Sequence, residues 1–88
     1  MNLRYSKKFA VALKKLSASD KAAALHALEW FEENPFAPQL RNHALTDSMA
    51  GKRALVVEHD LRIIFTERGN HRDVTLLDIG SHARVYRR

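Results

Sequence analysis

Residues 53–79 read RALVVEHDLRIIFTERGNHRDVTLLDI, and their three apolar runs separated by two polar turns decide the fold. The runs are rich in β-branched and aromatic residues, which is typical of strands; they span 53–58, 61–67 and 73–79. His59-Asp60 and Gly69-Asn70 mark the two turns, and short turns of this kind join antiparallel neighbours. The sequence therefore predicts an antiparallel meander.

The chain before this stretch predicts two helices. Ser6 can cap the first, whose apolar residues recur at helical spacing: Phe9, Ala12, Leu13 and Leu16. Ser17-Ala18-Ser19-Asp20 has the form of a capping box, so a second helix follows at once. Its apolar stripe consists of Ala24, Leu25, Leu28 and Phe31. It ends near Asn34, because Pro35 disfavours helical geometry in the residue before it.

Together these elements predict an α+β fold. We expect two antiparallel helices, joined by a very short turn, to cover one face of a small antiparallel sheet, since two-layer packing buries both apolar surfaces. The segment from Pro35 to about Gly51 is expected to be an irregular loop. A chain of 88 residues encloses one hydrophobic core, so residues 1–88 form a single domain. The other sheet face is left for a functional site.

Composition narrows the classes of function. The chain has no cysteine, which excludes disulfides and thiolate zinc sites and fits a reducing cytoplasm. No stretch has the apolar character of a signal peptide or the length of a membrane span, so we expect no membrane partner. The net charge of +5 favours a polyanion or an acidic protein, although a solvated basic surface remains an equal alternative. After Lys52 every Lys or Arg position is an arginine, whose fork binds phosphate in a bidentate way.

Candidate chemical groups lie in the segments that border the free sheet face: His43, Asp60, Arg62, His82, Arg84 and Tyr86. Asp60 and Arg62 are two residues apart and project to the same side if the strand begins at the turn; a surface ion pair is the alternative. Of the remaining histidines, we expect His26 to be a structural or surface residue, His59 to belong to the turn and His71 to be solvated.

The histidine, acidic and arginine residues among these candidates favour general acid and base catalysis next to arginines. No histidine pair or acidic residue has the spacing of a metal site, and no glycine fingerprint or nucleophilic triad is present, so no metal or cofactor is expected. Acid and base groups beside arginines suffice to cleave RNA, because RNA supplies its own nucleophile, the 2′-hydroxyl. A base removes the 2′ proton, an arginine steadies the phosphate, and an acid protonates the leaving 5′ oxygen.

Several runs in the second half together resemble a known family. They are Leu40-Arg41-Asn42-His43-Ala44-Leu45, Ala50-Gly51-Lys52-Arg53, Glu58-His59-Asp60-Leu61-Arg62-Ile63-Ile64-Phe65 and Ile79-Gly80-Ser81-His82-Ala83-Arg84-Val85-Tyr86. In order and spacing the sequence is similar to the RelE/ParE toxin superfamily, and within it to the YafQ-like branch of ribosome-dependent mRNA interferases. The likeness covers roughly residues 40–86, whereas the helical part agrees in pattern only.

The resemblance implies a toxin that cleaves mRNA in the ribosomal A site and is neutralised by a small cognate antitoxin in a hetero-oligomer. The catalytic residues that it implies are His43, Asp60, His82 and Tyr86. Arg62 matches a strand arginine that acts on the scissile phosphate, and Arg53 and Arg84 are the other expected phosphate-binding residues. Trp30, Phe31 and Phe36 are candidates for the antitoxin surface, with core packing expected for at least two of them.

Two departures from the YafQ-like pattern keep other functions open. Val56 stands where the pattern has a further histidine, and Asp47 stands where a glycine is usual. His59 is a candidate to compensate for Val56. The alternatives are a ParE-like inhibitor of DNA gyrase that cuts no nucleic acid, and an inactive homologue that only binds RNA or antitoxin. His43 and His82 favour the ribonuclease, because a gyrase binder has no need for them.

Overall fold

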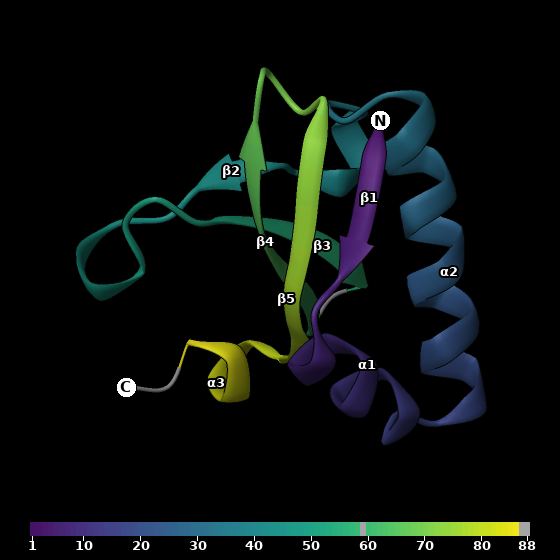
Figure 1. The fold of residues 1–88 in the computed structure, drawn as a ribbon. Helices are drawn as coiled ribbons and strands as arrows, with labels where there is room; N and C mark the ends of the chain where they lie inside the picture. Colours follow the sequence, from purple (N-terminus) through teal and green to yellow (C-terminus); the bar gives the residue numbers. More distant parts are fainter. Residues whose placement is uncertain (59, 87–88) are drawn as a thin grey trace.

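The computed structural model describes residues 1–58 and 60–86. Its elements follow in the order β1 (Asn2–Tyr5), α1 (Lys7–Lys14), α2 (Ala18–Glu33), the 3-10 helix η1 (Pro38–Leu40), β2 (His43–Ala44), the 3-10 helix η2 (Asp47–Met49), β3 (Arg53–Glu58), β4 (Leu61–Arg68), β5 (Asp73–Ser81) and α3 (His82–Val85). Figure 1 shows one central sheet with α2 and α3 on opposite sides of it. The predicted α+β class is therefore confirmed.

The sheet is mixed, so the prediction of a purely antiparallel sheet is wrong. Its strand order is β1-β5-β4-β3-β2. The meander of β3, β4 and β5 is present as predicted, and β2 adds antiparallel to β3. β1 pairs in parallel with β5, from Asn2 beside Asp73 to Tyr5 beside Leu76. A parallel pair needs a long crossover, which the helices and the meander between the two strands supply.

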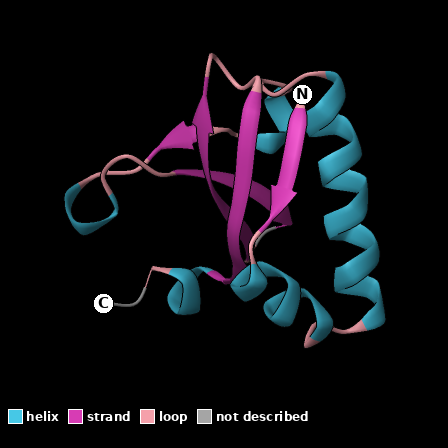
Figure 2. Ribbon diagram, viewed as in Figure 1, coloured by secondary structure: helices cyan, strands magenta, loops and turns pink. Residues whose placement is uncertain are grey.

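Both predicted helix caps are present. Ser6 Oγ accepts a hydrogen bond from the backbone N–H of Phe9 at 3.0 Å, and Ser17 Oγ accepts from that of Asp20 at 3.1 Å. Leu25, however, is 50% exposed and does not belong to the buried stripe of α2. Figure 2 shows α1 at the end of the sheet rather than alongside α2, so the antiparallel helix pair is not confirmed. No helix in the described chain is long and apolar enough to cross a bilayer.

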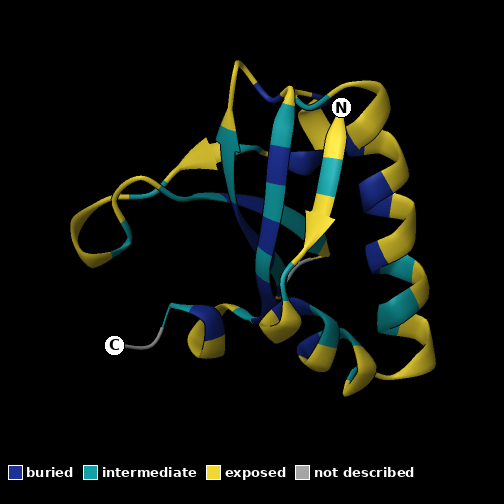
Figure 3. Ribbon diagram, in the orientation of Figure 1, coloured by how far each residue is buried: buried dark blue, intermediate teal, exposed yellow. Residues whose placement is uncertain are grey.

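The larger core lies between the helices and the sheet, as predicted. Phe31 of α2 is completely buried and meets Phe65 of β4 edge-on, with the ring centroids 5.1 Å apart. Phe9 of α1 is also completely buried in this cluster, which includes Leu55 of β3 and Leu76 of β5. Figure 3 shows the buried positions of α2 turned toward the sheet. This layer fixes the strands that carry the candidate site.

The second sheet face is partly covered rather than open. Ala54, Ile64 and Val85 form a small buried cluster there, against which Leu45, Met49, Leu77 and Tyr86 pack. The cover comes from α3 and from the segment between β2 and β3. The sequence predicted that residues 35–51 would be irregular, but this segment holds η1, β2 and η2. A hollow between that segment and α3 remains on this face, and it contains the candidate site.

Candidate functional site

A cavity of about 460 Å³ on the second face brings four predicted site residues together. They are His43 of β2, Arg62 of β4, His82 of α3 and Tyr86 directly after α3. Within residues 1–58 and 60–86, the lining comprises Arg41, His43, Leu45, Thr46, Asp47, Met49, Val56, Arg62, His82 and Tyr86. Residues far apart in sequence thus form one pocket with two imidazoles, a phenol and two guanidinium groups.

His43 is held by a bond to the backbone near it. Its Nδ1 atom lies 2.6 Å from the carbonyl oxygen of Arg41. A carbonyl only accepts, so Nδ1 must carry a proton and donate. In the neutral ring Nε2 is then unprotonated. His43 can therefore take up a proton at Nε2, and release it again, without breaking the bond that orients the ring.

His82 and Tyr86 are presented by α3, which begins directly after β5. Ser81 Oγ caps this helix by accepting from the backbone N–H of Arg84 at 3.2 Å. The four-residue spacing places the rings of His82 and Tyr86 together, with centroids 4.5 Å apart and planes at 66°. Burial raises the pKa of the Tyr86 phenol, while Arg62 acts in the opposite direction. Tyr86 is therefore a protonated donor at neutral pH.

Arg62 and Val56 face each other across two strands. They are register partners in the β3–β4 ladder, next to an irregularity between Val56 and Glu58. Arg62 Nη1 donates to the carbonyl of Glu58 at 2.9 Å, which holds the guanidinium at the wall of the pocket. The position where the resemblance expects a further histidine is thus an apolar part of the same wall.

Asp60 does not line this pocket. β4 begins at Leu61, so Asp60 lies outside the strand and borders a separate hollow with Glu58 and Asp20. Its contact with the site is indirect, because the backbone N–H of His82 donates to its carbonyl oxygen at 3.1 Å and approaches its Oδ1 at 3.3 Å. Asp60 therefore fixes the start of α3.

Arg53 and Arg84 also lie outside the lining. Arg53 faces the helix side of the sheet, where its Nε donates to Asn42 Oδ1 at 2.8 Å and its guanidinium lies 5.9 Å from the Phe36 ring centroid. Arg84 Nη1 donates to Asp78 Oδ1 at 2.9 Å and to the carbonyl of Ile79 at 2.8 Å. The expected phosphate role of these two arginines therefore gains no geometric support.

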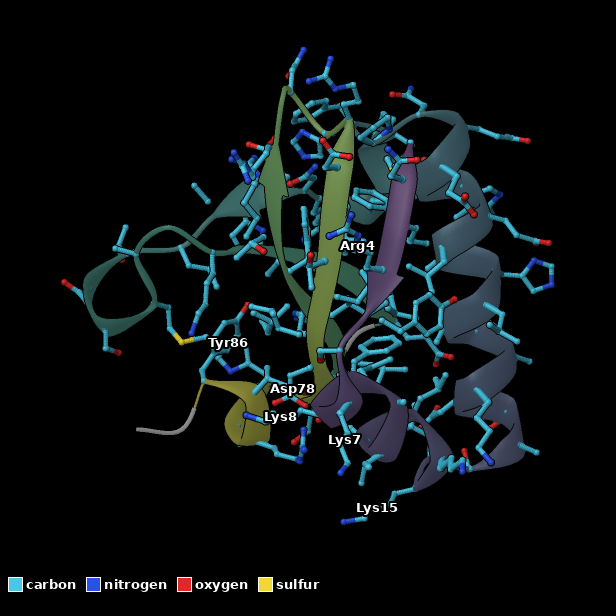
Figure 4. The ribbon with its side chains drawn as sticks, viewed as in Figure 1. Arg4, Lys7, Lys8, Lys15, Asp78 and Tyr86 are labelled. Carbon is cyan, nitrogen blue, oxygen red and sulfur yellow. The ribbon has the colours of Figure 1, made fainter. Side chains whose placement is uncertain are left out.

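Arg84 stabilises the junction of β5 and α3. Its partner Asp78 has a side chain only 12% exposed, and Lys8 approaches the same carboxylate at 3.6 Å (Figure 4). The guanidinium lies close over Gly80, where an added Cβ would be 2.6 Å from Arg84 Nη1, so a larger residue there would make the Arg84 side chain shift. The ion pair therefore holds α3, with His82 and Tyr86, against the last strand.

Replacing Arg84 with alanine is expected to lower the free energy of unfolding by about 1–2 kcal/mol. The loss is limited because Arg84 is 46% exposed in its side chain and Lys8 remains beside Asp78. Urea unfolding measures the effect. Arg68→Ala, an exposed arginine on β4, is the matched control and should change stability by less than about 0.5 kcal/mol. Equal stability of the two variants would contradict the assigned role.

His71 is buried, so the prediction that it is solvated is wrong. Only 5% of it is exposed, and its ring packs edge-on against Phe31, Phe36 and Phe65. Burial lowers the pKa of His71; Glu67 opposes this and Arg53 adds to it. The turn after β4 brings it inside, because Asn70 and His71 both adopt positive φ, at 55° and 68°. His71 is thus a neutral histidine in the core.

We expect the domain to lose stability as the pH falls below about 6.5, the ordinary histidine pKa. His71 has a lowered pKa in the folded state, so the unfolded chain binds its proton first; the stabilisation is complete above about pH 6.5 and is lost toward the folded pKa. Urea unfolding at about pH 7.5 and about pH 5.5 measures this loss. His71→Gln, which cannot titrate, should show a smaller loss; an equal loss would contradict the prediction.

Sequence reasoning missed several pocket residues because they come from the supposed irregular loop. Arg41, Thr46 and Asp47 line the pocket, and Arg41 and Asp47 have positive φ values of 47° and 55°. Asp47, noted as a departure from the family pattern, is therefore part of the site. His26 is exposed and lies 3.6 Å from Glu29, as expected for a surface residue. His59 lies outside the described residues.

The described residues offer no group of three or more His, Cys, Asp or Glu side chains arranged to hold a metal ion.

Comparison with known proteins places the fold. No family model matches the sequence, and no curated protein matches it significantly. Among solved structures, the chain resembles one from the toxin–antitoxin complex RelBE2 of Mycobacterium tuberculosis at 18% identity and a TM-score of 0.75, covering 92% of this chain and 96% of that one. YafQ from Escherichia coli is 20% identical to this chain with a TM-score of 0.74, and the match covers 97% of each chain.

A YoeB/ParE toxin from Agrobacterium tumefaciens is 15% identical with a TM-score of 0.75, covering 93% of this chain and 99% of that one. All three likenesses extend over nearly the whole chain, including the helices, which agreed with the family only in pattern at the sequence level. The protein therefore has the fold of RelE-, YafQ- and YoeB/ParE-type toxins, and the resemblance seen in the sequence extends to three dimensions.

Proposed function

We propose that this protein is the toxin of a type II toxin–antitoxin pair and cleaves mRNA on the ribosome without a metal or cofactor. The observation that carries the proposal is the convergence of His43, His82, Arg62 and Tyr86 on one pocket. The fold shared with YafQ and with a chain of the RelBE2 toxin–antitoxin complex supports it. DNA would not be a substrate, because it lacks the 2′-hydroxyl.

His43 suits the role of general base, because its neutral ring leaves Nε2 unprotonated. Nε2 takes the 2′ proton of the RNA as the 2′ oxygen bonds to the adjacent phosphorus. The bond from phosphorus to the 5′ oxygen then breaks, and His82 gives that oxygen a proton. The products are a 2′,3′-cyclic phosphate and a 5′-hydroxyl end, with the 2′ proton left on His43 and the proton of His82 on the 5′ oxygen.

Arg62 and Tyr86 complete the proposed reaction. Arg62 would bind the phosphate oxygens on which charge develops, since a guanidinium at the pocket wall lowers the energy of the transition state. Tyr86 would stack on a base or donate a hydrogen bond, because its raised pKa keeps the phenol protonated. Asp60 acts through the bond to the His82 backbone, as a positioning residue rather than a catalytic one.

Translation of a defined message in a purified system tests the function. We expect cleavage during translation, 5′-hydroxyl ends at the cuts, and an unchanged rate when EDTA-treated protein replaces the untreated one. Intact mRNA together with inhibited DNA supercoiling by gyrase would move the protein to the gyrase-inhibitor class. Intact mRNA and normal supercoiling would indicate the inactive homologue that Val56 keeps open.

The proposed partner is a small cognate antitoxin with an acidic, amphipathic segment, which suits a protein of net charge +5. Of the three aromatic residues considered for this surface, only Phe31 is buried; Trp30 and Phe36 are 45% and 54% exposed. The expectation that at least two would pack in the core is therefore wrong, and two remain available to a partner. The proposed complex is a toxin–antitoxin hetero-oligomer in the cytoplasm, where translated mRNA is found.

A further inference from the structure

Asn42 joins three other segments of the chain through its side-chain amide. Its Nδ2 lies 3.0 Å from the carbonyl oxygen of Pro35 and 3.0 Å from His71 Nε2, while its Oδ1 accepts from Arg53 Nε at 2.8 Å. Pro35 follows α2, Arg53 lies on β3, and His71 lies in the turn between β4 and β5. The amide thus ties the chain just before β2 to the sheet and to the neighbouring turn.

The chemistry of the partners fixes the direction of each bond. A guanidinium only donates and a carbonyl only accepts, so Asn42 must present Oδ1 to Arg53 and Nδ2 to Pro35. The second Nδ2 proton is then donated to His71, whose Nε2 accepts and carries no proton. His71 holds its ring proton on Nδ1, which is buried without a hydrogen-bond partner among the described residues. A proton on Nε2 would set two donors against each other.

This network ends one residue before His43. The Asn42 side chain lies on the helix side of the sheet, whereas His43 lines the pocket on the other side. Before Asn42, Arg41 adopts φ 47° and ψ 45°, a left-handed conformation that few non-glycine residues take. That conformation brings the Arg41 carbonyl to His43 Nδ1. Asn42 and the almost completely buried Leu40 hold the chain on either side of Arg41.

We infer that Asn42 is a positioning residue for His43. Its amide, bonded to Arg53 and His71, holds the left-handed turn at Arg41, and this turn fixes the tautomer of His43 that leaves Nε2 unprotonated. The buried His71 is the acceptor that completes the network. The structural part of this inference concerns the ring of His43 alone; its catalytic part rests on the proposed ribonuclease function.

Histidine tautomers in the full-length protein, read from two-bond ¹H–¹⁵N spectra at about pH 7.5, test the inference. In the wild-type protein His43 and His71 should both carry the ring proton on Nδ1. In Asn42→Ala, His43 should become a mixture with the Nε2–H form. The kcat for mRNA cleavage should fall about tenfold to a hundredfold, because the base is misplaced, while KM stays within about twofold.

Three further variants separate this role from a general loss of structure. Gln39→Ala, an exposed change on the same loop, should retain the His43 tautomer and full cleavage. His71→Gln keeps an acceptor for Asn42 and should behave like the wild type, whereas His71→Leu should behave like Asn42→Ala. This pair decides the matter if Asn42→Ala does not fold.

A wild-type His43 tautomer in either disruptive variant would overturn the inference. A wild-type protein that cleaves no mRNA would instead remove the proposed function. The tautomer comparison would then still decide whether Asn42 positions His43, because it does not depend on cleavage.

Discussion

Replacing His82 with alanine is expected to lower the rate of mRNA cleavage by about a hundredfold to ten-thousandfold. His82 is the second imidazole of the pocket and the proposed proton donor to the leaving 5′ oxygen, and among the described residues His43 is the only other histidine that lines the pocket. Primer extension on a message translated in a purified system measures the rate. Growth arrest on expression of the protein should disappear in parallel.

The exposed histidine of α2 provides the matched control for this prediction. His26→Ala removes the same side chain from a position away from the pocket and should cleave mRNA at the wild-type rate. The His82 variant should still bind the antitoxin, since its ring is exposed and the α3 cap belongs to Ser81. Undiminished cleavage by His82→Ala would remove His82 from the reaction.

Replacing Phe31 with alanine is expected to cost about 3–5 kcal/mol of the free energy of unfolding. Phe31 is completely buried and joins α2 to the sheet through its edge-on contact with Phe65, so the variant leaves a cavity in the core. A domain of this size has a total stability of only about 5–15 kcal/mol. The substitution should therefore remove a large share of the total stability and lower the unfolding temperature clearly.

Trp30, the neighbour of Phe31 on α2, provides a variant that distinguishes an effect on stability from an effect on partner binding. Trp30→Ala removes a larger ring that is 45% exposed, so its stability should change by less than about 1 kcal/mol. Under the proposed function this variant should instead weaken binding of the antitoxin. Thermal unfolding and a binding titration on both variants test the distinction; equal destabilisation would contradict the assignment of Phe31 to the core and Trp30 to the surface.

The parts of the fold that could be predicted are those encoded locally. The meander follows from apolar runs and turns that are adjacent in sequence, and the helix starts follow from the serines that cap them. β1 was missed because it is short, three of its four residues are exposed, and its partner strand lies at the other end of the chain. A polar edge strand has no alternation of its own to reveal it.

The candidate site could be predicted only in part from the sequence. His43, Arg62, His82 and Tyr86 converge as the resemblance implied, although their chemical roles stay predictions. Alternation along β3 explains the placement of Arg53, because Ala54 belongs to the pocket face and its neighbour must turn away.

The network around Asn42 was not predictable. It depends on a contact between Asn42 and His71, which are 29 positions apart, and on a left-handed residue that no local pattern announces.

The parallel pairing of β1 with β5 has a consequence for how the protein comes into being. The bond from Asn2 to Asp73 closes a loop of 71 positions, so the edge of the sheet forms only when almost the entire chain is available. Closing such a long loop costs conformational entropy, which slows folding. The pairing of β1 with β5 is therefore expected to form late, in one cooperative step. His43 and Arg62 are made before β5 is complete, yet the strand leading to His82 and Tyr86 is the one that β1 must find. A nascent chain that has not reached β5 therefore contains His43 and Arg62 but lacks His82 and Tyr86, so its pocket is incomplete.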